Sequence, residues 1–185
     1  MIITALSLPG VYLVELELQA DARGHFARSF DSAQFQARQL VHAFTQHSVS
    51  YNHKRGTLRG MHYQAAPHGE VKLVRCTRGA VFDVVVDLRE DSPTRGRWLS
   101  VELSADNGRA VYIPAYCAHG FITLQDHSEL LYMIDVPYEP SAARCLRWDD
   151  PLLAVDWPLQ PLVISERDAT APHFATMTTT TPTEP

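Results

Sequence analysis

The chain has 185 residues, 45% of them hydrophobic and 20% charged, a balance that is ordinary for one soluble globular domain. Its formal net charge of -5 argues against the broad basic surface of a nucleic-acid binder, so no nucleic-acid partner is expected. Neither a signal peptide nor a long apolar run occurs, and the 3 cysteines have no C-x-x-C spacing, which together indicate a cytoplasmic protein with no membrane partner.

Short apolar segments dominate the chain, and most alternate with a period of two residues or consist of β-branched residues. Turn signals rich in glycine, proline, aspartate and asparagine separate them. Many short strands at such spacing predict an all-β sandwich or barrel. In chain order, strands are expected over residues 11–18, 71–76, 81–88, 98–103, 111–113, 121–124 and 130–134.

One helix is predicted over residues 32–43, because Asp31 or Ser32 can cap its start and Phe35 and Leu40 give it an apolar side. Residues 151–161 are punctuated by proline and are expected to wrap the surface. The end of the chain, 176–185, is mostly threonine and proline and is predicted to be disordered. A single domain is therefore expected over residues 1–175.

Two segments carry the side chains most suited to chemistry. The first, G-T-L-R-G-M-H-Y-Q, contains Arg59 and His62, and the second, P-A-Y-C-A-H-G, contains His119. Their glycine, proline and histidine spacing resembles the two motifs of the cupins, which are double-sheet jelly rolls. A metal-binding cupin carries a second histidine where this chain has Gln64, so a metal site would have to use His62, His119, Glu70 and an amide. Transition metals prefer better ligands, and no metal is expected.

A longer series of motifs runs from Asp21 to Asp168 and includes L-R-G-M-H-Y-Q, E-V-K-L-V-R, A-H-G-F, L-Y-M, W-D-D-P and S-E-R-D. In order and spacing it resembles the dTDP-4-dehydrorhamnose 3,5-epimerase family of nucleotide-sugar epimerases. The resemblance implies a cupin-like double-stranded β-helix with a few short helices. It also implies an isomerase of carbohydrate biosynthesis that inverts C3, C5 or both carbons of a nucleotide-diphosphate-linked 4-keto-6-deoxy sugar. That reaction is redox-neutral, so no cofactor is expected.

The resemblance gives each catalytic candidate a role. Epimerisation beside a C4 ketone needs a base, a group that holds the enolate oxygen, and an acid on the opposite face. His62 matches the family's base, and an imidazole with an unperturbed pKa of roughly 6.5 suits that task. Asp168 matches the carboxylate that orients the base, and Lys72 matches the cation at the developing oxyanion. Tyr132 matches the acid, with Tyr138 as the alternative donor.

Further positions match family residues that hold the substrate: Arg23, Arg59, His119, Gln46, Ser48, Arg167 and Tyr138. Arg23 and Arg59 are expected to hold the diphosphate or nucleotide, because a guanidinium group fits phosphate oxygens. The family also implies a homodimer with exchanged N-terminal strands, in which Arg23 completes the partner's site. Arg28 and Ala143 stand where the family has glutamates near the nucleotide, which suggests a nucleotide other than dTDP.

Two other classes of function stay open. A metal-dependent cupin enzyme, a dioxygenase or isomerase with His62 and His119 as ligands, would hold iron, manganese or zinc after clean purification. A sugar-nucleotide binder without catalysis would bind its ligand, and His62→Asn would change nothing. The presence of His62, Lys72, Tyr132 and Asp168 together favours the epimerase over the binder.

Overall fold

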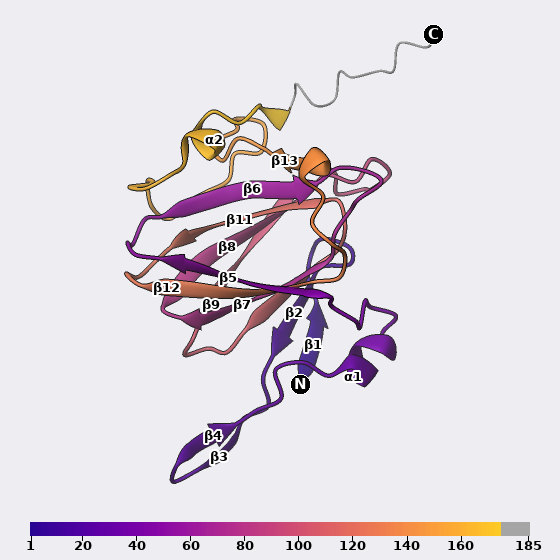
Figure 1. Cartoon of the computed structure of the whole chain (residues 1–185), viewed down its shortest axis with the longest axis vertical. Helices are drawn as coiled ribbons and strands as arrows, with labels where there is room; N and C mark the ends of the chain where they lie inside the picture. The colour runs from indigo at the N-terminus through magenta and orange to yellow at the C-terminus, as the bar shows by residue number, and fades with distance from the viewer. Residues whose placement is uncertain (175–185) are drawn as a thin grey trace.

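The computed structural model describes residues 1–174 and consists mainly of two facing antiparallel sheets (Figure 1). The six-stranded sheet has the order β1 (Ile2–Ala5), β2 (Tyr12–Glu15), β10 (Ala110–Ile113), β7 (Lys72–Arg78), β12 (Ser128–Ile134) and β5 (Gln46–Asn52). The five-stranded sheet has the order β13 (Ala143–Cys145), β6 (Leu58–Gln64), β11 (Cys117–Thr123), β8 (Ala80–Asp87) and β9 (Trp98–Ser104). The chain crosses repeatedly between them, and the predicted double-stranded β-helix is confirmed.

All seven predicted strands are present, with shifted ends. The strand expected over residues 11–18 is shorter, because β2 ends at Glu15, whereas the strand expected over 121–124 begins earlier as β11. A separate hairpin of β3 (Gln19–Asp21) and β4 (Gly24–Phe26) extends away from the two sheets (Figure 1). This hairpin makes no sheet pairing with the rest of the described chain.

The predicted helix over residues 32–43 is wrong in its extent, because α1 covers only Ser32–Gln36. Asp31 caps it by accepting hydrogen bonds from the backbone of Ala33 and Gln34. The helix ends at Gln36 with Ala37 as its C-cap, Gln39 then takes a φ of 59°, and the backbone N–H of Leu40 donates to the carbonyl of Phe35. Beyond this point the apolar side chains continue in irregular backbone and pack on the outer face of the six-stranded sheet.

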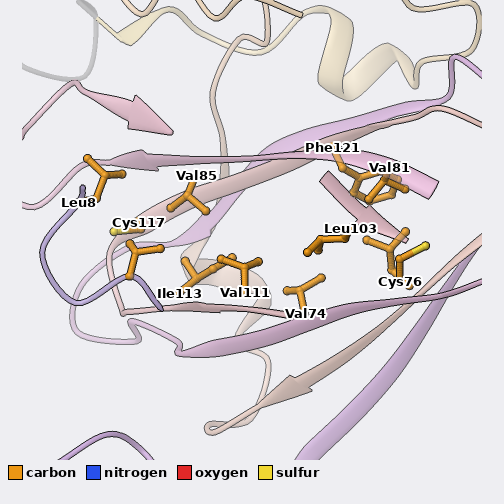
Figure 2. Packing of buried hydrophobic residues seen from close by; sticks show 12 residues of the cluster. Leu8, Val74, Cys76, Val81, Val85, Leu103, Val111, Ile113, Cys117 and Phe121 are labelled. Atoms are coloured by element: carbon orange, nitrogen blue, oxygen red, sulfur yellow. The ribbon is translucent and has the colours of Figure 1, made fainter. Parts of the chain in front are cut away.

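Buried hydrophobic side chains fill the space between the two sheets, as Figure 2 shows for residues such as Val74, Val85, Val111 and Phe121. A second layer, which includes Met61 and Leu153, covers the outer face of the five-stranded sheet. This layer brings in the proline-punctuated segment 151–161, most of whose residues are exposed as predicted. The remaining helices are η1 (Pro140–Ala142) and α2 (Glu166–Ala169).

The predicted disordered tail, 176–185, lies outside the described residues, so the boundary at residue 175 stays a prediction. Within residues 1–174, none of the helices has both the length and the apolar composition that crossing a bilayer requires.

Candidate active site

Strands β6 and β11 place His62 and His119 directly opposite each other in the antiparallel register. Two glycines let the strands come this close. Gly60 has a φ of +144°, and a Cβ there would lie 2.5 Å from the Cα of Gly120. A Cβ on Gly120 would in turn lie 2.6 Å from the Met61 sulfur. Because paired residues on one face are neighbours, the two imidazoles enter the same region between the sheets.

His62 and Asp168, 106 positions apart in sequence, form a hydrogen bond of 2.8 Å between Nε2 and Oδ1. Asp168 reaches β6 from α2, which is capped by the Ser165 side chain. The second carboxylate oxygen of Asp168 accepts a hydrogen bond of 3.1 Å from the backbone N–H of Gly60. The side chain of Asp168 is only 5% exposed, whereas that of His62 is 40% exposed. The pair thus has a buried, fixed acceptor and a solvent-facing imidazole.

The charge of Asp168 determines which nitrogen of His62 carries the proton. Burial raises the pKa of Asp168, but hydrogen bonds from His62 and from the Gly60 backbone outweigh burial and hold the pKa below its ordinary value. An ionised carboxylate only accepts, so we assign the proton of the neutral imidazole to Nε2. Nδ1 makes no hydrogen bond to any residue in the described range 1–174, and its lone pair is free.

Lys72, at the start of β7, is buried beside the same strand. Its ammonium group lies 2.9 Å from Glu70 and donates a hydrogen bond of 3.3 Å to the backbone carbonyl of His62. The amide of Gln64 contacts the other oxygen of Glu70 at 3.4 Å. A paired, desolvated cation therefore lies next to the base candidate.

Tyr132 comes from β12 in the opposite sheet, and its ring lies edge-on to His119 with 5.7 Å between the ring centroids. Burial raises the pKa of Tyr132, and the nearby Asp83 raises it further. The phenol consequently stays protonated near neutral pH. Ser48 on β5 is paired with Tyr132, so its side chain lies on the same face of that sheet.

Asp83, which is not among the residues predicted from the sequence, accepts a hydrogen bond of 2.7 Å from Nε2 of His119. Both side chains are almost fully buried, and Oδ1 of Asp83 has no hydrogen-bond partner in the described chain. Burial raises the pKa of Asp83, and His119 opposes that shift. An aspartate in the otherwise apolar strand V-F-D-V-V-V was the available signal.

The predicted substrate-binding residues fall into two groups. Arg59 is held by the Asn52 side chain at 2.8 Å, and the Gln46 side chain accepts a hydrogen bond of 3.0 Å from the backbone of Tyr138. Tyr138 is 56% exposed, unlike Tyr132, which lies between the sheets. These residues and Ser48 lie on β5, on β6 or on the segment that follows β12.

Arg23 and Arg167 differ from the others. Arg167 follows Glu166 on α2 and is exposed beside Asp168. Arg23 is not brought to the site within one chain: its side chain is 90% exposed on the projecting hairpin and contacts Asp21 at 2.6 Å (Figure 1). Within residues 1–174, contacts link His62 with Asp168 and Lys72, and His119 with Tyr132, whereas Arg23 contacts none of the other predicted site residues.

The metal-binding alternative required His62, His119, Glu70 and Gln64 to converge. In the described residues the two imidazoles are instead held by separate carboxylates, and Glu70 is paired with Lys72. The group of three possible metal ligands that does converge in residues 1–174 consists of His62, Cys145 and Asp168.

A surface cavity of about 650 Å³ lies apart from this group, and its lining includes Tyr63, Arg89, Tyr116 and Phe174. Tyr63 is on β6 beside His62, but it packs in the outer layer with Met61, on the opposite face of the strand. None of the predicted site residues lines this cavity.

A family profile and individual relatives both match most of the chain. The sequence profile described as dTDP-4-dehydrorhamnose 3,5-epimerase matches residues 5–176 of the chain. A dTDP-4-dehydrorhamnose 3,5-epimerase of Pseudomonas aeruginosa is 43% identical over 179 residues, which cover 93% of this chain and 95% of that protein.

Two solved structures with bound nucleotides are also similar. The dTDP-6-deoxy-D-glucose-3,5-epimerase RmlC of Legionella pneumophila, in complex with dTDP-4-keto-L-rhamnose, gives a TM-score of 0.87 at 36% identity and covers 92% of this chain and 91% of its own. The 3'-monoepimerase ChmJ of Streptomyces bikiniensis, in complex with dTDP-quinovose, gives a TM-score of 0.88 at 38% identity and covers 95% and 89%.

Proposed function

Since the chain belongs to the dTDP-4-dehydrorhamnose 3,5-epimerase family and is an isomerase of nucleotide sugars, we propose that it inverts C3, C5 or both carbons of a dTDP-linked 4-keto-6-deoxy sugar. The observation that carries the proposal is the His62–Asp168 pair, which faces the same space between the sheets as Lys72 and Tyr132. Arg28 and Ala143, in place of the family's glutamates, suggested a nucleotide other than dTDP. We nevertheless choose dTDP, because the structures of two relatives contain dTDP sugars.

In the first step His62 acts as the base. Asp168 accepts a hydrogen bond from the Nε2–H group and so leaves the Nδ1 lone pair to remove a proton from the carbon next to the C4 ketone. The carboxylate then stabilises the imidazolium that forms, as in other carboxylate-oriented histidine bases. The partial exposure of His62 gives the substrate access to that nitrogen.

In the second step the C4 oxygen carries the negative charge of the enolate, and Lys72 is the cation near it. Removal of one preorganised donor to an oxyanion costs roughly 3 kcal/mol in measured hydrolases. Lys72 is already anchored by Glu70 and by the His62 carbonyl, so it needs little reorganisation during the reaction.

In the third step Tyr132 returns a proton to the opposite face of the sugar. A phenol kept protonated by burial and by Asp83 is a suitable donor to a carbanion, which is a much stronger base than a phenolate. Tyr138 is the less suitable candidate, because its side chain is largely in solvent. Whether one carbon or two are inverted follows from how the ring turns in the site, and the relatives include both kinds of enzyme.

The homodimer belongs to the same proposal. A two-stranded hairpin on its own is at best marginally stable in water, yet β3 and β4 extend away from the sheets (Figure 1). The hairpin region also exposes Phe26 and Leu18, which are 68% and 54% exposed. A second copy of the chain would cover these side chains and receive Arg23 at its own site.

The test follows C3 and C5 protons by NMR while the purified, metal-analysed protein is incubated in deuterated water with dTDP- or GDP-linked 4-keto-6-deoxy sugars. Exchange and inversion at one or both carbons with the dTDP sugar, lost in His62→Asn, are expected. Equal turnover of the GDP sugar would contradict the choice of dTDP. No exchange with either nucleotide, particularly with stoichiometric iron, manganese or zinc, would favour the metal-dependent cupin instead.

A further inference from the structure

Cys145 lies beside the His62–Asp168 pair. It is paired with His62 in the register of β13 and β6, so the two side chains lie on the same face. Its sulfur is 3.6 Å from Oδ1 of Asp168, the atom that also accepts the bond from His62. One nitrogen, one sulfur and one carboxylate oxygen lie within 4.8 Å of one another. Three possible metal-ligand atoms, a nitrogen, a sulfur and an oxygen, therefore lie close together.

This set matches the ligands that zinc prefers. Zinc binds imidazole nitrogen, cysteine sulfur and carboxylate oxygen at roughly 2.0 to 2.3 Å, which places tetrahedral ligands about 3.5 Å from one another. The three donors would each have to move by only about 1 Å to reach that arrangement. Since the His62 side chain is 40% exposed, the ion can enter from solvent and keep a water in the fourth position.

We propose that His62, Cys145 and Asp168 bind one thiophilic divalent cation of the Zn²⁺ type, and that the bound ion inhibits the enzyme. The inhibition rests on the proposed role of His62 as the base, whereas the binding does not. The bound ion has no part in the epimerisation itself, and a metal-free enzyme is the active form.

Inhibition follows from a change in which nitrogen of His62 carries the proton. Zinc takes the lone pair of Nε2 and thereby displaces the proton of that nitrogen, which moves through water to Nδ1. The thiol of Cys145 loses its proton to the solvent, and Asp168 exchanges a hydrogen bond for a metal bond. A protonated Nδ1 has no lone pair, so it accepts no proton from the sugar. The net products are the bound ion and one released proton.

The other two cysteines provide an internal comparison. Cys76 and Cys117 are also free and buried in the core between the sheets. In the described residues neither belongs to a group of three converging ligand atoms. A hard cation such as Mg²⁺ prefers six oxygen ligands in an octahedron and does not suit the site. Zinc sensitivity is therefore expected to depend on Cys145 alone.

Binding is measured without any reference to activity, by titrating the metal-free protein with Co²⁺ and recording the thiolate-to-cobalt charge-transfer band in the near ultraviolet. One equivalent is expected to saturate the band in the parent and in Cys117→Ser, and Cys145→Ser is expected to lack it. Serine keeps the size of the side chain and a donor toward Asp168. A parent without the band, or a band that persists in Cys145→Ser, would overturn the proposal.

Inhibition is measured as the Zn²⁺ concentration that halves epimerase turnover, with each variant compared with its own metal-free rate. Loss of a residue behind a metal ligand typically costs 10- to 100-fold in affinity, so loss of a ligand in Cys145→Ser should raise this concentration by about tenfold or more. A chelator should restore turnover, and Mg²⁺ should have no effect. Identical Zn²⁺ sensitivity in parent and Cys145→Ser would refute the site. If no turnover exists at all, the proposed function fails while the cobalt titration still decides the metal site.

Discussion

At the scale of single residues, the His62–Asp168 pair controls a tautomer as well as a position. Asp168 accepts from His62 and from the Gly60 backbone, and it is almost fully buried. A carboxylate in that place can only accept, and this leaves the Nδ1 atom of His62 as the free acceptor. The rate should therefore depend on the charge of residue 168 and not only on its size.

Asp168→Asn tests that dependence, because an amide can turn its NH₂ group toward His62 and so favour the tautomer with the proton on Nδ1. We expect kcat to fall by about 10²- to 10⁴-fold with little change in KM. Asp150→Asn is the matched control, because Asp150 forms another histidine–aspartate contact away from the site, with His173 at 3.2 Å. The control should lower the melting temperature and keep kcat, and an Asp168→Asn enzyme with the parent kcat would contradict the assignment.

Tyr132→Phe should separate proton removal from inversion. With the acid gone from the opposite face, His62 still removes the proton and returns it, or a deuteron from solvent, on the original face. Deuterium incorporation into unchanged substrate should then rise relative to product, as measured by NMR in deuterated water. Tyr138→Phe should leave that ratio unchanged, because its side chain is largely exposed. If only Tyr138→Phe raises the ratio, Tyr138 is the acid.

The catalytic candidates could be named from the sequence because each stands in a short motif, and their chemical roles stay predictions. Asp83 and Asn52 could not, since their importance comes from neighbours on other strands: Asp83 holds His119, and Asn52 holds Arg59. The sequence distance from Asn52 to its arginine is short, but the contact depends on how β5 and β6 face each other. Side-chain pairing of this kind is a property of the fold and not of a local pattern.

At the scale of elements, the site depends on the close approach of β6 and β11. Gly60 and Gly120 allow that approach, and each lies close in sequence to a site histidine: His62 is two residues after Gly60, and His119 directly precedes Gly120. Strand β6 was not among the strands predicted from periodicity. Apolar and polar residues alternate in Leu58–Gln64, but the alternation changes phase at Gly60, so the strand has no continuous period of two.

The helix predicted over residues 32–43 was too long, because tertiary packing overrides the local pattern after Gln36. The apolar spacing after Ser32 suits a helix, but Leu40 and its neighbours pack better on the outer face of the sheet as irregular backbone. Local pattern gave the start of α1, including the Asp31 cap, and tertiary packing decided its end.

Gly60→Ala should destabilise the protein by about 3 kcal/mol or more, because the backbone has a φ of +144° and the new methyl group would meet Gly120. Urea unfolding measures the free-energy change. Gly24→Ala is a useful comparison, since its φ is +131° but nothing lies within 4 Å of a Cβ there. The difference between the two variants isolates the steric contribution. Equal losses would mean that close strand approach contributes nothing.

Asp87, the last residue of β8, is expected to make a pH-dependent contribution to the stability of the fold. Burial raises the pKa of Asp87, but hydrogen bonds from Arg89, Ser92 and Thr94 outweigh it and hold the pKa well below its ordinary value. A carboxyl whose pKa is lower in the folded state stabilises the fold above its unfolded pKa, about 3.9, and loses that contribution as the pH falls below it.

Asp87→Asn should therefore cost about 3 kcal/mol of unfolding free energy at pH 7. Below about pH 3.9, the difference from the parent should shrink by up to about 1.4 kcal/mol per pH unit. Urea unfolding of both proteins at pH 7 and at about pH 3 measures this change. A difference that does not vary with pH would show that the charge of Asp87 is not responsible.

At the scale of the whole molecule, one copy of the chain leaves Arg23 on a projecting hairpin with exposed apolar neighbours (Figure 1). The jelly roll itself was predictable, because strand count and turn spacing are distributed along the sequence. The position of the hairpin was not predictable, because nothing local to its residues states which surface it covers. A twofold homodimer would let each copy supply Arg23 to the other, since such interfaces are reciprocal.

Mixing two impaired variants tests this exchange. Arg23→Ala should raise KM more than it lowers kcat, whereas His62→Asn should abolish turnover. If Arg23 acts across the dimer, a mixed dimer of the two variants holds one intact site, which combines His62 of one copy with Arg23 of the other. Random exchange makes half of the dimers mixed, so about a quarter of the parent's turnover per site should return at low substrate concentration. Mass spectrometry of the intact complexes checks that mixed dimers form. Mixed dimers without recovered turnover would place Arg23 in the site of its own chain or outside the site altogether.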